Sequence, residues 1–482
     1  MLMTCLTKSP SKQTRYKAGY VTIFFTLALS LIVPLLIGMF YSVRKNAIVM
    51  KTVSTVNTGM ISEFAEYNRE LWEQYGLIFV DSSYMSKGTG MIKAENHLKE
   101  CINKNFDECR LGLLGGKDLL KLECSNAETT GVCLATDNNF AAMKHQAVNL
   151  MKYHYKIAYI DEVSDWVNTI DEYGLSQGVS YDGAGSASNE LNSHYGIDYS
   201  GWVPSTTGGN DLSEDNIWSL GILGRVTDIS RLSTTQISND NYAWKRELNK
   251  GNLAIDYDFG IEDAFFLREY ALEMCGDFIN EKDNSVLKYQ TEYLVTGKES
   301  DPDNLAGVVR RIMVIREAAN MITLCSDTER INEIKTICSI LCGLVGAPEA
   351  AELLEAIVIA CWANFESLAD VRILLKGGRI PLIKSCDQWI TGIRTALFGE
   401  GSIDTYNEGL SYEDYLRIFL YLTGEKKILG RLSSIIEMDV RATDGNEWFR
   451  LDNCFDAWEV LINVESKHGY KYSLKRMRKV YE

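Results

Sequence analysis

The longest apolar run without a charged residue is YVTIFFTLALSLIVPLLIGMFYSV, at residues 20–43. As a helix rising about 1.5 Å per residue, these 24 residues span about 36 Å, enough to cross a hydrocarbon core of about 30 Å. Near its end the run offers no pair of small residues suited to signal-peptide cleavage before Arg44 and Lys45. The pattern therefore predicts a retained transmembrane helix over residues 19–43, with Pro34 as a candidate kink.

Beyond Arg44 a helical pattern continues, because apolar residues recur every three or four positions and so share one face. We expect one helix from about Gly19 to Tyr75, which leaves the membrane as a stalk. Its apolar face can pack on the chain's own domain or on a neighbour's helix. Gly76 then ends the helix, and an entry strand completes the segment at residues 44–84. The residues of the face are Val49, Val53, Val56, Met60, Phe64, Tyr67 and Leu71.

The remaining pattern predicts a mainly α protein with a small antiparallel β element. Residues 85–250 form a mixed region, whose Gly/Ser/Asn/Asp-rich part at 174–216 is expected to be a long loop. Apolar residues at helical spacing predict a helical bundle at residues 251–430. Alternating apolar residues near the end predict two strands joined near Gly469, within a β closing segment at residues 431–482.

The charge distribution predicts the side of the membrane that each part occupies. Four basic residues precede the apolar run and three follow it, which favours a cytoplasmic position for residues 1–18. No second segment is apolar over 18 residues, so the pattern predicts a single membrane crossing and an extracellular C-terminal part. That part carries all 65 acidic residues and 42 of the 49 basic ones, a net charge near −23. Such a surface repels nucleic acid, and we expect no nucleic-acid partner.

Twelve cysteines fall into two groups by their surroundings. Four cysteines of the predicted extracellular part cluster in a loop-rich region, and two disulfides among them are possible in an oxidising environment. These are Cys101, Cys109, Cys124 and Cys133. Most of the others fall in apolar helical patterns, where we expect small buried hydrophobes. No CxxC pair is present, which argues against a zinc ribbon or a thioredoxin-like site.

Candidate catalytic and metal-binding motifs are weak. GLSQG at residues 174–178 matches a nucleophile-elbow pattern around Ser176, and His194 follows, but a helical pattern precedes the serine where an elbow needs a strand. The five histidines form neither HxH nor HExxH. The acidic stretches at residues 256–263 and 299–304 fit no EF-hand and are expected to begin helices. We therefore predict no enzyme, no catalytic residue, no cofactor, no metal and no small-molecule substrate.

Several stretches together resemble a known family. KAGYVTIFFTLALSLIVPLLIGMFYSVRKNA is similar to the N-terminus of TadE/TadG-like pseudopilin-type proteins of the tight adherence (Tad, Flp-type) pilus. More closely, five stretches resemble a large uncharacterised ectodomain family associated with such loci in Gram-positive bacteria. They are SEFAEYNRELWEQYGLIFVDSSY, YLVTGKESDPDNLAGVVRRIMVIREAANM, GGRIPLIK, LSYEDYLRIFLYL and FRLDNC. The resemblance covers most of the chain except about residues 85–250.

The resemblance implies a membrane-anchored extracellular protein that builds or anchors a type IV-like pilus. It implies lipid as a partner through residues 19–43, and pilus subunits or the assembly platform as protein partners. Gly19 stands where the prepilin peptidase would cut, but Phe24 occupies the place of the pilin glutamate. This departure favours an assembly or anchoring component over a repeating subunit. The alternative is a surface adhesin or cell-wall-binding protein that uses the helix only as a tether; a tethered hydrolase comes third.

Overall fold

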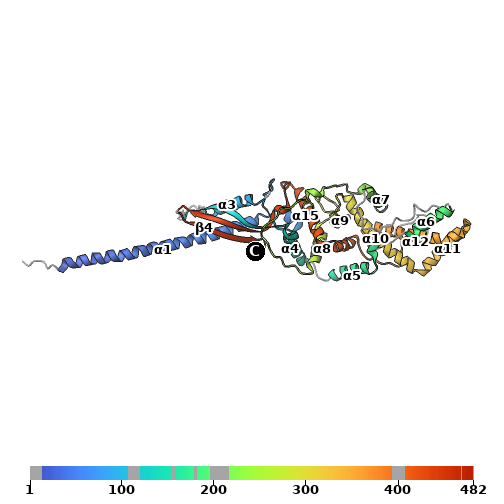
Figure 1. The fold of residues 1–482 in the computed structure, drawn as a ribbon, viewed down its shortest axis with the longest axis horizontal. Coiled ribbons are helices and arrows are strands. Elements are labelled where there is room, and N and C mark those ends of the chain that lie inside the picture. Colours follow the sequence, from blue (N-terminus) through green and yellow to red (C-terminus); the bar gives the residue numbers. More distant parts are fainter. Residues whose placement is uncertain are drawn as a thin grey trace, which may run out of the picture. The chain divides into compact units, whose positions relative to one another are not determined.

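The computed structural model describes residues 13–88, 90–106, 120–154, 159–178, 182–195, 216–392, 408–467 and 469–480 (Figure 1). The chain divides into two compact units. We call residues 1–66, 91–132 and 457–482 the stalk unit, and residues 67–90 and 133–456 the helical unit. Helices predominate among the described residues. The strands form one small sheet, and the two longest paired segments near the C-terminus are residues 454–466 and 471–479. The predicted fold class is thereby confirmed.

The stalk unit is built on α1, Gln13–Ala65, with α3, Ile92–Phe106, packed against its second half (Figure 1). Four buried residues of α3 recur every fourth position and so form one face: Ala94, Leu98, Ile102 and Phe106. Gly59 of α1 lets the two helices approach closely, since a Cβ there would lie 3.1 Å from Ile102 Cγ1 and 3.3 Å from Leu98 Cδ1. Lys51 also donates to the carbonyl of Phe106 at 3.2 Å.

The strands of the stalk unit are β4, Lys471–Lys479, and the parts of β2, Leu122–Leu134, and β3, Cys454–Ser466, that belong to it. β3 and β4 pair antiparallel from Ala457 opposite Lys479 to Glu465 opposite Lys471. Gly469, with φ +81°, lies between them, as expected of a tight turn that needs a left-handed residue. β2 is the neighbour of β3 on its other side. The predicted pair of strands is confirmed.

The helix predicted from Gly19 to Tyr75 is interrupted. α1 ends at Ala65, and a separate helix, α2, Arg69–Tyr75, follows. The cause is Asn68, whose backbone is extended and whose side chain accepts a hydrogen bond from the amide of Leu71 at 2.9 Å. Asparagine favours this helix-capping arrangement over a helix interior. Gly76 ends α2 in the left-handed conformation, as predicted.

The helical unit packs its helices around α10, Asp301–Ser326, and α12, Ala351–Leu375, which contact each other extensively. A short strand, β1, Val80–Asp81, pairs with the first two residues of β3. The other elements are α4 Asp137–His154, α5 Tyr159–Glu172, η1 Leu175–Gln177, α6 Asp182–Tyr195, α7 Asn216–Val226, η2 Ile229–Arg231, η3 Asn239–Asn241, α8 Asp263–Met274, α9 Gln290–Thr296, α11 Thr328–Leu344, η4 Pro348–Ala350, η5 Cys386–Gln388, α14 Tyr412–Leu422, α15 Glu425–Arg441 and η6 Leu451–Asn453.

The long loop expected at residues 174–216 is wrong in part, because α6 forms within it. Ala184, Ala187 and Leu191 lie on one face of α6 and are buried in a cluster with residues of α12. Small side chains let a helix lie close to its neighbour, although the same glycines and serines are typical of loops. Residues 179–181 and 196–215 lie outside the described residues.

A buried ion cluster joins α10 and α12 to the segment that follows them. Arg316 Nε donates to Asp370 Oδ2 at 2.9 Å, and Arg316 Nη1 donates to the carbonyl of Leu382 at 2.7 Å. Lys384 Nζ lies 2.6 Å from Asp370 Oδ1 and also contacts Glu366. All four charged residues are at most 3% exposed. Two cations face two carboxylates, so the desolvated charges are balanced.

Replacing Lys384 with methionine should lower the free energy of unfolding of the helical unit by about 3–5 kcal/mol, because it leaves two buried carboxylates opposite a single cation. Lys335→Met is the matched control. Lys335 is 55% exposed and 3.8 Å from Glu355, so its loss should cost less than about 1 kcal/mol. Urea unfolding of the full-length chain in detergent, followed by helical circular dichroism, measures both. Equal costs for the two variants would contradict the role given to the cluster.

Candidate functional site

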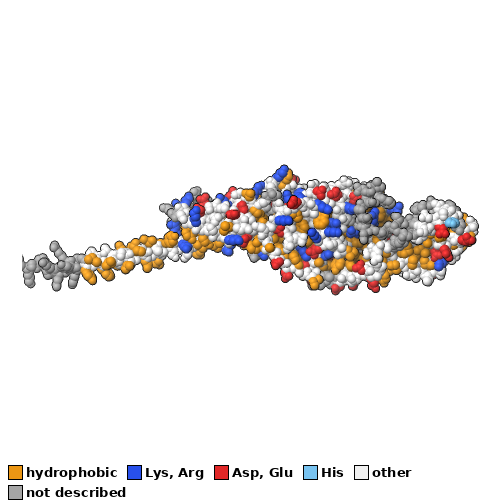
Figure 2. Space-filling view, viewed as in Figure 1, with side chains coloured by type: hydrophobic (Ala, Val, Ile, Leu, Met, Phe, Trp, Pro, Cys, Tyr) orange, Lys and Arg blue, Asp and Glu red, His pale blue; other side chains and the backbone are white. Residues whose placement is uncertain are grey.

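The first half of α1 exposes an apolar surface. Every large apolar side chain from Tyr20 to Val43 is exposed, as Figure 2 shows along this part of the helix. The helix is long and apolar enough to cross a membrane. An exposed apolar surface of this extent marks an interaction with lipid or with another protein. It is the most pronounced surface feature of the stalk unit.

Two hydroxyl groups within this span donate hydrogen bonds to backbone carbonyls of the same helix. The hydroxyl of Thr26 donates to the carbonyl of Ile23 at 2.9 Å, and that of Ser30 donates to Leu27 at 2.7 Å. α1 continues through Pro34, which removes one backbone donor. Hydroxyls bonded in this way suit an apolar medium, where an unpaired donor is costly.

No carboxylate lies in the span. Gly19, the candidate processing residue, lies within α1, and Phe24 is 63% exposed on the same helix. The first acidic residue of the chain is Glu63, near the C-terminal end of α1. The exposed part of α1 and its first carboxylate are thus separated by about 20 residues, or roughly 30 Å of helix.

The packed part of α1 keeps much of the predicted apolar face inside the protein. Val56, Met60 and Phe64 are buried, and so is Leu71 in α2. Val49 and Val53 are half-buried. At the buried positions, the apolar face therefore packs on the chain's own residues, which is one of the two alternatives given by the sequence. Tyr67, at 38%, is exposed.

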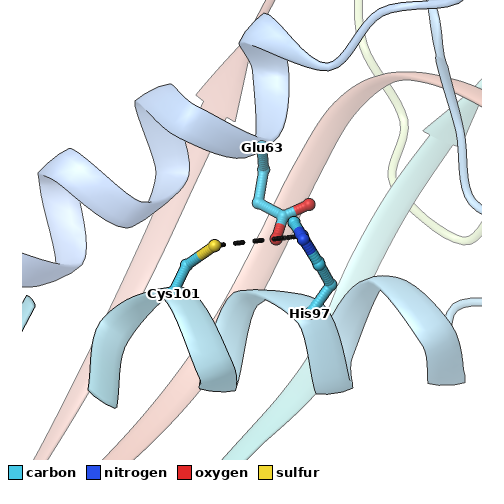
Figure 3. A group of neighbouring side chains, drawn as sticks. All are labelled: Glu63, His97 and Cys101. Carbon is cyan, nitrogen blue, oxygen red and sulfur yellow. Dashed lines mark hydrogen bonds and ion pairs between the residues drawn. The ribbon is translucent and has the colours of Figure 1, made fainter. Parts of the chain in front are cut away.

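A cluster of three side chains lies at the packed end of α1 (Figure 3). Glu63 comes from α1, while His97 and Cys101 come from α3, where a spacing of four residues places them on one face. Glu63 is fully buried, and the side chain of His97 is 30% exposed. His97 Nδ1 lies 2.8 Å from Glu63 Oε1 and 3.9 Å from Cys101 Sγ, and it is 3.6 Å from Glu66 Oε2. These residues offer nitrogen, sulfur and oxygen atoms to one point.

The electrostatics of the cluster oppose nucleophilic chemistry. Burial, together with the carboxylates of Glu63 and Glu66, raises the pKa of the Cys101 thiol. A thiol with a raised pKa holds little thiolate near neutral pH and is a weak nucleophile. Sequence reasoning missed the cluster because Glu63 and His97 are 34 positions apart on different helices. The available signal was the His97 and Cys101 pair, four residues apart on a helix face.

Of the four cysteines for which two disulfides are possible, Cys101 and Cys124 carry free thiols in this structure. Cys101 faces His97, and the Cys124 thiol donates to the carbonyl of Asn126 at 3.6 Å. Cys133 is buried with its sulfur 3.8 Å from Tyr257 Oη, and Cys109 lies outside the described residues. Six of the seven cysteines after residue 250 are buried, as predicted for small hydrophobes: Cys275, Cys338, Cys342, Cys361, Cys386 and Cys454.

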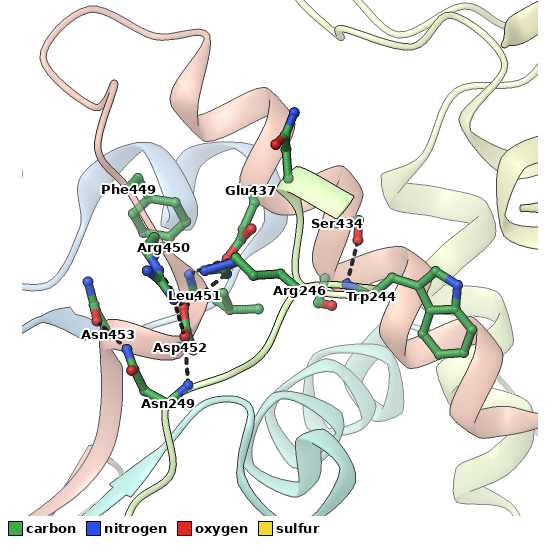
Figure 4. Close-up of polar contacts among 12 residues, drawn as sticks. Trp244, Arg246, Asn249, Ser434, Glu437, Phe449, Arg450, Leu451, Asp452 and Asn453 are labelled. Carbon is green, nitrogen blue, oxygen red and sulfur yellow. Dashed lines mark hydrogen bonds and ion pairs between the residues drawn. The ribbon is translucent and has the colours of Figure 1, made fainter. Parts of the chain in front are cut away.

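The helical unit contains a polar hub around Glu437 and Asp452 (Figure 4). Arg246 Nη2 lies 2.7 Å from Glu437 Oε1 and 3.0 Å from Asp452 Oδ1. Arg450 Nη2 lies 2.8 Å from Asp452 Oδ2, which also accepts from the amide of Asn249 at 2.8 Å. Burial raises the pKa of Glu437. For Asp452 burial acts in the same direction, but the hydrogen bond from Arg450 and the other donors outweigh it, so its pKa is lowered.

This hub is structural in character. Both carboxylates are buried and are held by backbone amides as well as by arginines: Leu451 donates to Glu437 at 2.9 Å, and Asn249 donates to Asp452. A catalytic carboxylate must reach a substrate proton within hydrogen-bond distance. The hub instead joins α15 to the turn of residues 446–453 and to the segment around Arg246.

Glu292 has the most perturbed carboxyl group for which a value is resolved. Burial, with a contribution from Asp277, raises its pKa to about 8. Tyr412 Oη and the amide of Phe278 donate to Oε1 at 2.6 and 2.9 Å. Oε2 is buried without a hydrogen-bond partner among the described residues. Such a group is a candidate acid or base by its pKa, but its full burial separates it from any substrate.

The remaining sequence candidates have structural roles. Ser176 lies in η1 after a helix rather than after a strand, and His194 is exposed on α6, 3.0 Å from Ser193 Oγ. Ser300 caps α10 by accepting from the amide of Asp303, as predicted for residues 299–304. In the other acidic stretch, Asp263 accepts from the amide of Gly260 at 2.9 Å at the start of α8.

Comparison with known protein families identifies a family for part of the chain. A protein-family model described as a family of unknown function (DUF5702) matches residues 212–466, slightly more than half of the chain. The matched region contains the ion cluster, the polar hub and Glu292, whereas α1 and α3 precede it. No curated protein and no solved structure matches the chain.

Glu292 should make stability depend on pH. In the folded protein the Glu292 carboxyl group keeps its proton up to about pH 8. In the unfolded chain the carboxyl group loses this proton above about pH 4.3. The folded state therefore binds more protons in this window, so stability falls as pH rises, by about 1.4 kcal/mol per pH unit in the middle.

Glu292→Gln should flatten this dependence between pH 5 and 8 in urea unfolding of the full-length chain, because glutamine stays neutral. Glu281→Gln, the same change at an exposed position, is the control and should keep the wild-type slope. A wild-type slope in Glu292→Gln would show that Glu292 is ionised in the folded state.

Proposed function

The chain belongs to this family of unknown function (DUF5702), and we propose that it is a membrane-anchored, pseudopilin-like component that assembles or anchors a Tad-type, type IV-like pilus. In this proposal it catalyses no reaction. Its N-terminus lies in the cytoplasm, residues 20–43 cross the membrane, and the helical unit and the rest of the stalk unit lie outside the cell. The observation that carries the proposal is that one helix, α1, exposes an uncharged apolar span over residues 20–43 and is packed against α3 over its second half.

A helix of this kind suits assembly better than tethering. A tether needs only the span, and a flexible linker can join it to a domain. Here the helix continues from the span into the stalk unit, and Gly59 brings it close to α3. A sideways force or contact on the span is therefore transmitted to a packed unit. That property is of use to a component that docks against neighbouring helices.

The absence of a carboxylate in the span favours an anchoring or assembly role over that of a repeating subunit. In pilins, a glutamate five residues after the processed glycine pairs with the N-terminus of the next subunit. Phe24 takes that position here, and the first carboxylate, Glu63, is buried beside His97. The size of the chain, 482 residues, points in the same direction, since repeating subunits of thin filaments are usually small.

A non-enzymatic role is supported by the position of the perturbed groups. Glu292, Glu437 and Asp439 have raised pKa values because they are buried, and each accepts hydrogen bonds within the helical unit. Carboxyl groups buried in this way are not exposed to a substrate at the surface. The alternative, an adhesin or cell-wall-binding protein tethered by α1, shares these features and differs only in what the span contacts.

Replacing residues 20–43 with an unrelated transmembrane helix of equal length distinguishes the assembly role from the tethered adhesin. The basic flanks stay unchanged, so the chain should still enter the membrane in the same orientation. We expect pili to be lost from cells of the native host, because the new helix lacks the matched surface. Electron microscopy and quantification of sheared filaments measure this. The control is a wild-type amount of the variant in the membrane fraction. Normal piliation with the replaced helix would reject the assembly role and favour the tether.

A further inference from the structure

We propose that Glu63, His97 and Cys101 bind a divalent d-block cation, Zn²⁺ in the first place, which joins α1 to α3 in the stalk unit. The carboxylate of Glu66 lies 3.6 Å from His97 Nδ1 and adds negative charge next to the three ligands. The site is independent of the pilus role, since it rests on side chains of the stalk unit and holds for a tether as well.

The main evidence for this metal site is the set of contacts that His97 Nδ1 makes. This single nitrogen faces Glu63 Oε1 at 2.8 Å, Glu66 Oε2 at 3.6 Å and Cys101 Sγ at 3.9 Å. One Nδ1–H can make one good hydrogen bond, and the contact with Glu63 takes it. A second carboxylate and a sulfur atom also approach this nitrogen, at distances longer than a good hydrogen bond to an oxygen atom. This is the arrangement expected around a shared metal ion.

The distances fit zinc closely. Zinc lies about 2.0 Å from nitrogen and oxygen ligands and about 2.3 Å from sulfur, so tetrahedral angles separate its ligand atoms by about 3.3 to 3.6 Å. The separations from Nδ1 to sulfur and to Glu66 are longer than these values by about 0.3 to 0.4 Å. Only the hydrogen-bonded pair of His97 and Glu63 is closer, and it would open by about 0.5 Å to admit the ion.

Ligand chemistry and charge favour the same ion. Imidazole, thiolate and carboxylate are the three side-chain ligands of zinc, whereas calcium and magnesium prefer oxygen alone. Glu63, Glu66 and Glu100 surround Cys101 with negative charge, against one cation, Lys104. A divalent ion offsets this excess and permits the thiolate to form.

A metal at this point has a defined mechanical consequence. Two of its ligands lie one turn apart on α3, and the third lies on α1, four residues after Gly59. The ion would therefore fix the rotation and height of α1 on α3. Sequence patterns for zinc sites, such as CxxC or HExxH, do not reveal it, because its ligands are divided between two helices.

Cobalt binding tests the site directly, since Co²⁺ occupies zinc sites and is coloured. The full-length chain in detergent, reduced and stripped of metal with a chelator, is titrated with Co²⁺ without oxygen. We expect one equivalent to produce a near-ultraviolet thiolate-to-cobalt charge-transfer band with visible bands of a tetrahedral ion, and Zn²⁺ to abolish both. The melting temperature should also rise with Zn²⁺ concentration.

Variants assign the signal to these residues. Cys101→Ser should abolish the charge-transfer band, and His97→Ala should weaken binding at least tenfold. Cys325→Ser and His194→Ala remove an exposed cysteine and histidine elsewhere and should change neither. Glu63→Gln, which keeps an acceptor for His97, serves as a further ligand variant if another misfolds by circular dichroism. No band in the wild type, or an unchanged band in Cys101→Ser, would overturn the proposal and leave a hydrogen bond between His97 and Glu63.

Discussion

The close packing of α1 on α3 is the contact on which the rest of the stalk unit depends. α1 has two environments along its length: residues 20–43 carry no charged side chain and expose their large apolar side chains, and one face of the later part is buried against the protein. The hydrophobic surface of the first half has no partner within the described chain, so its orientation is set by the contacts of the second half. Gly59 makes those contacts close, and Glu63 and His97 add a polar contact near the end of the helix. A helix held in this way is a rigid extension of a folded unit.

The helical unit depends on a different constraint, the balance of buried charges. Arg316, Lys384, Glu366 and Asp370 form one balanced cluster, and Glu437 and Asp452 with their arginines form another. Breaking such a cluster by removing one partner is costly because the others remain desolvated. Two of the stretches that carry the family resemblance, GGRIPLIK and FRLDNC, contain Lys384 and Asp452. Their role in this structure is to hold neighbouring segments together, which suits a scaffold more than a catalyst.

Periodicity predicted the helices, the closing strand pair and the buried face of α1, because each depends on a local pattern of apolar residues. It failed where local and tertiary preferences compete. Asn68 ended the stalk helix by capping the next one, and the small residues of α6 formed a helix because α12 covers them. The candidate metal site could not be found from spacing, since Glu63 and His97 meet only after α1 and α3 pack.

The central claim, that residues 20–43 remain part of the working protein as a membrane-embedded helix, is tested most directly by N-terminal sequencing. The chain is isolated from the membrane fraction and from sheared filaments of the native host, and the first residues of each are determined. This account predicts a chain in the membrane fraction that begins at or before Tyr20 and so retains the whole span. A chain that begins beyond Val43 and is recovered from the medium would contradict it, since the span would then be a removed signal peptide.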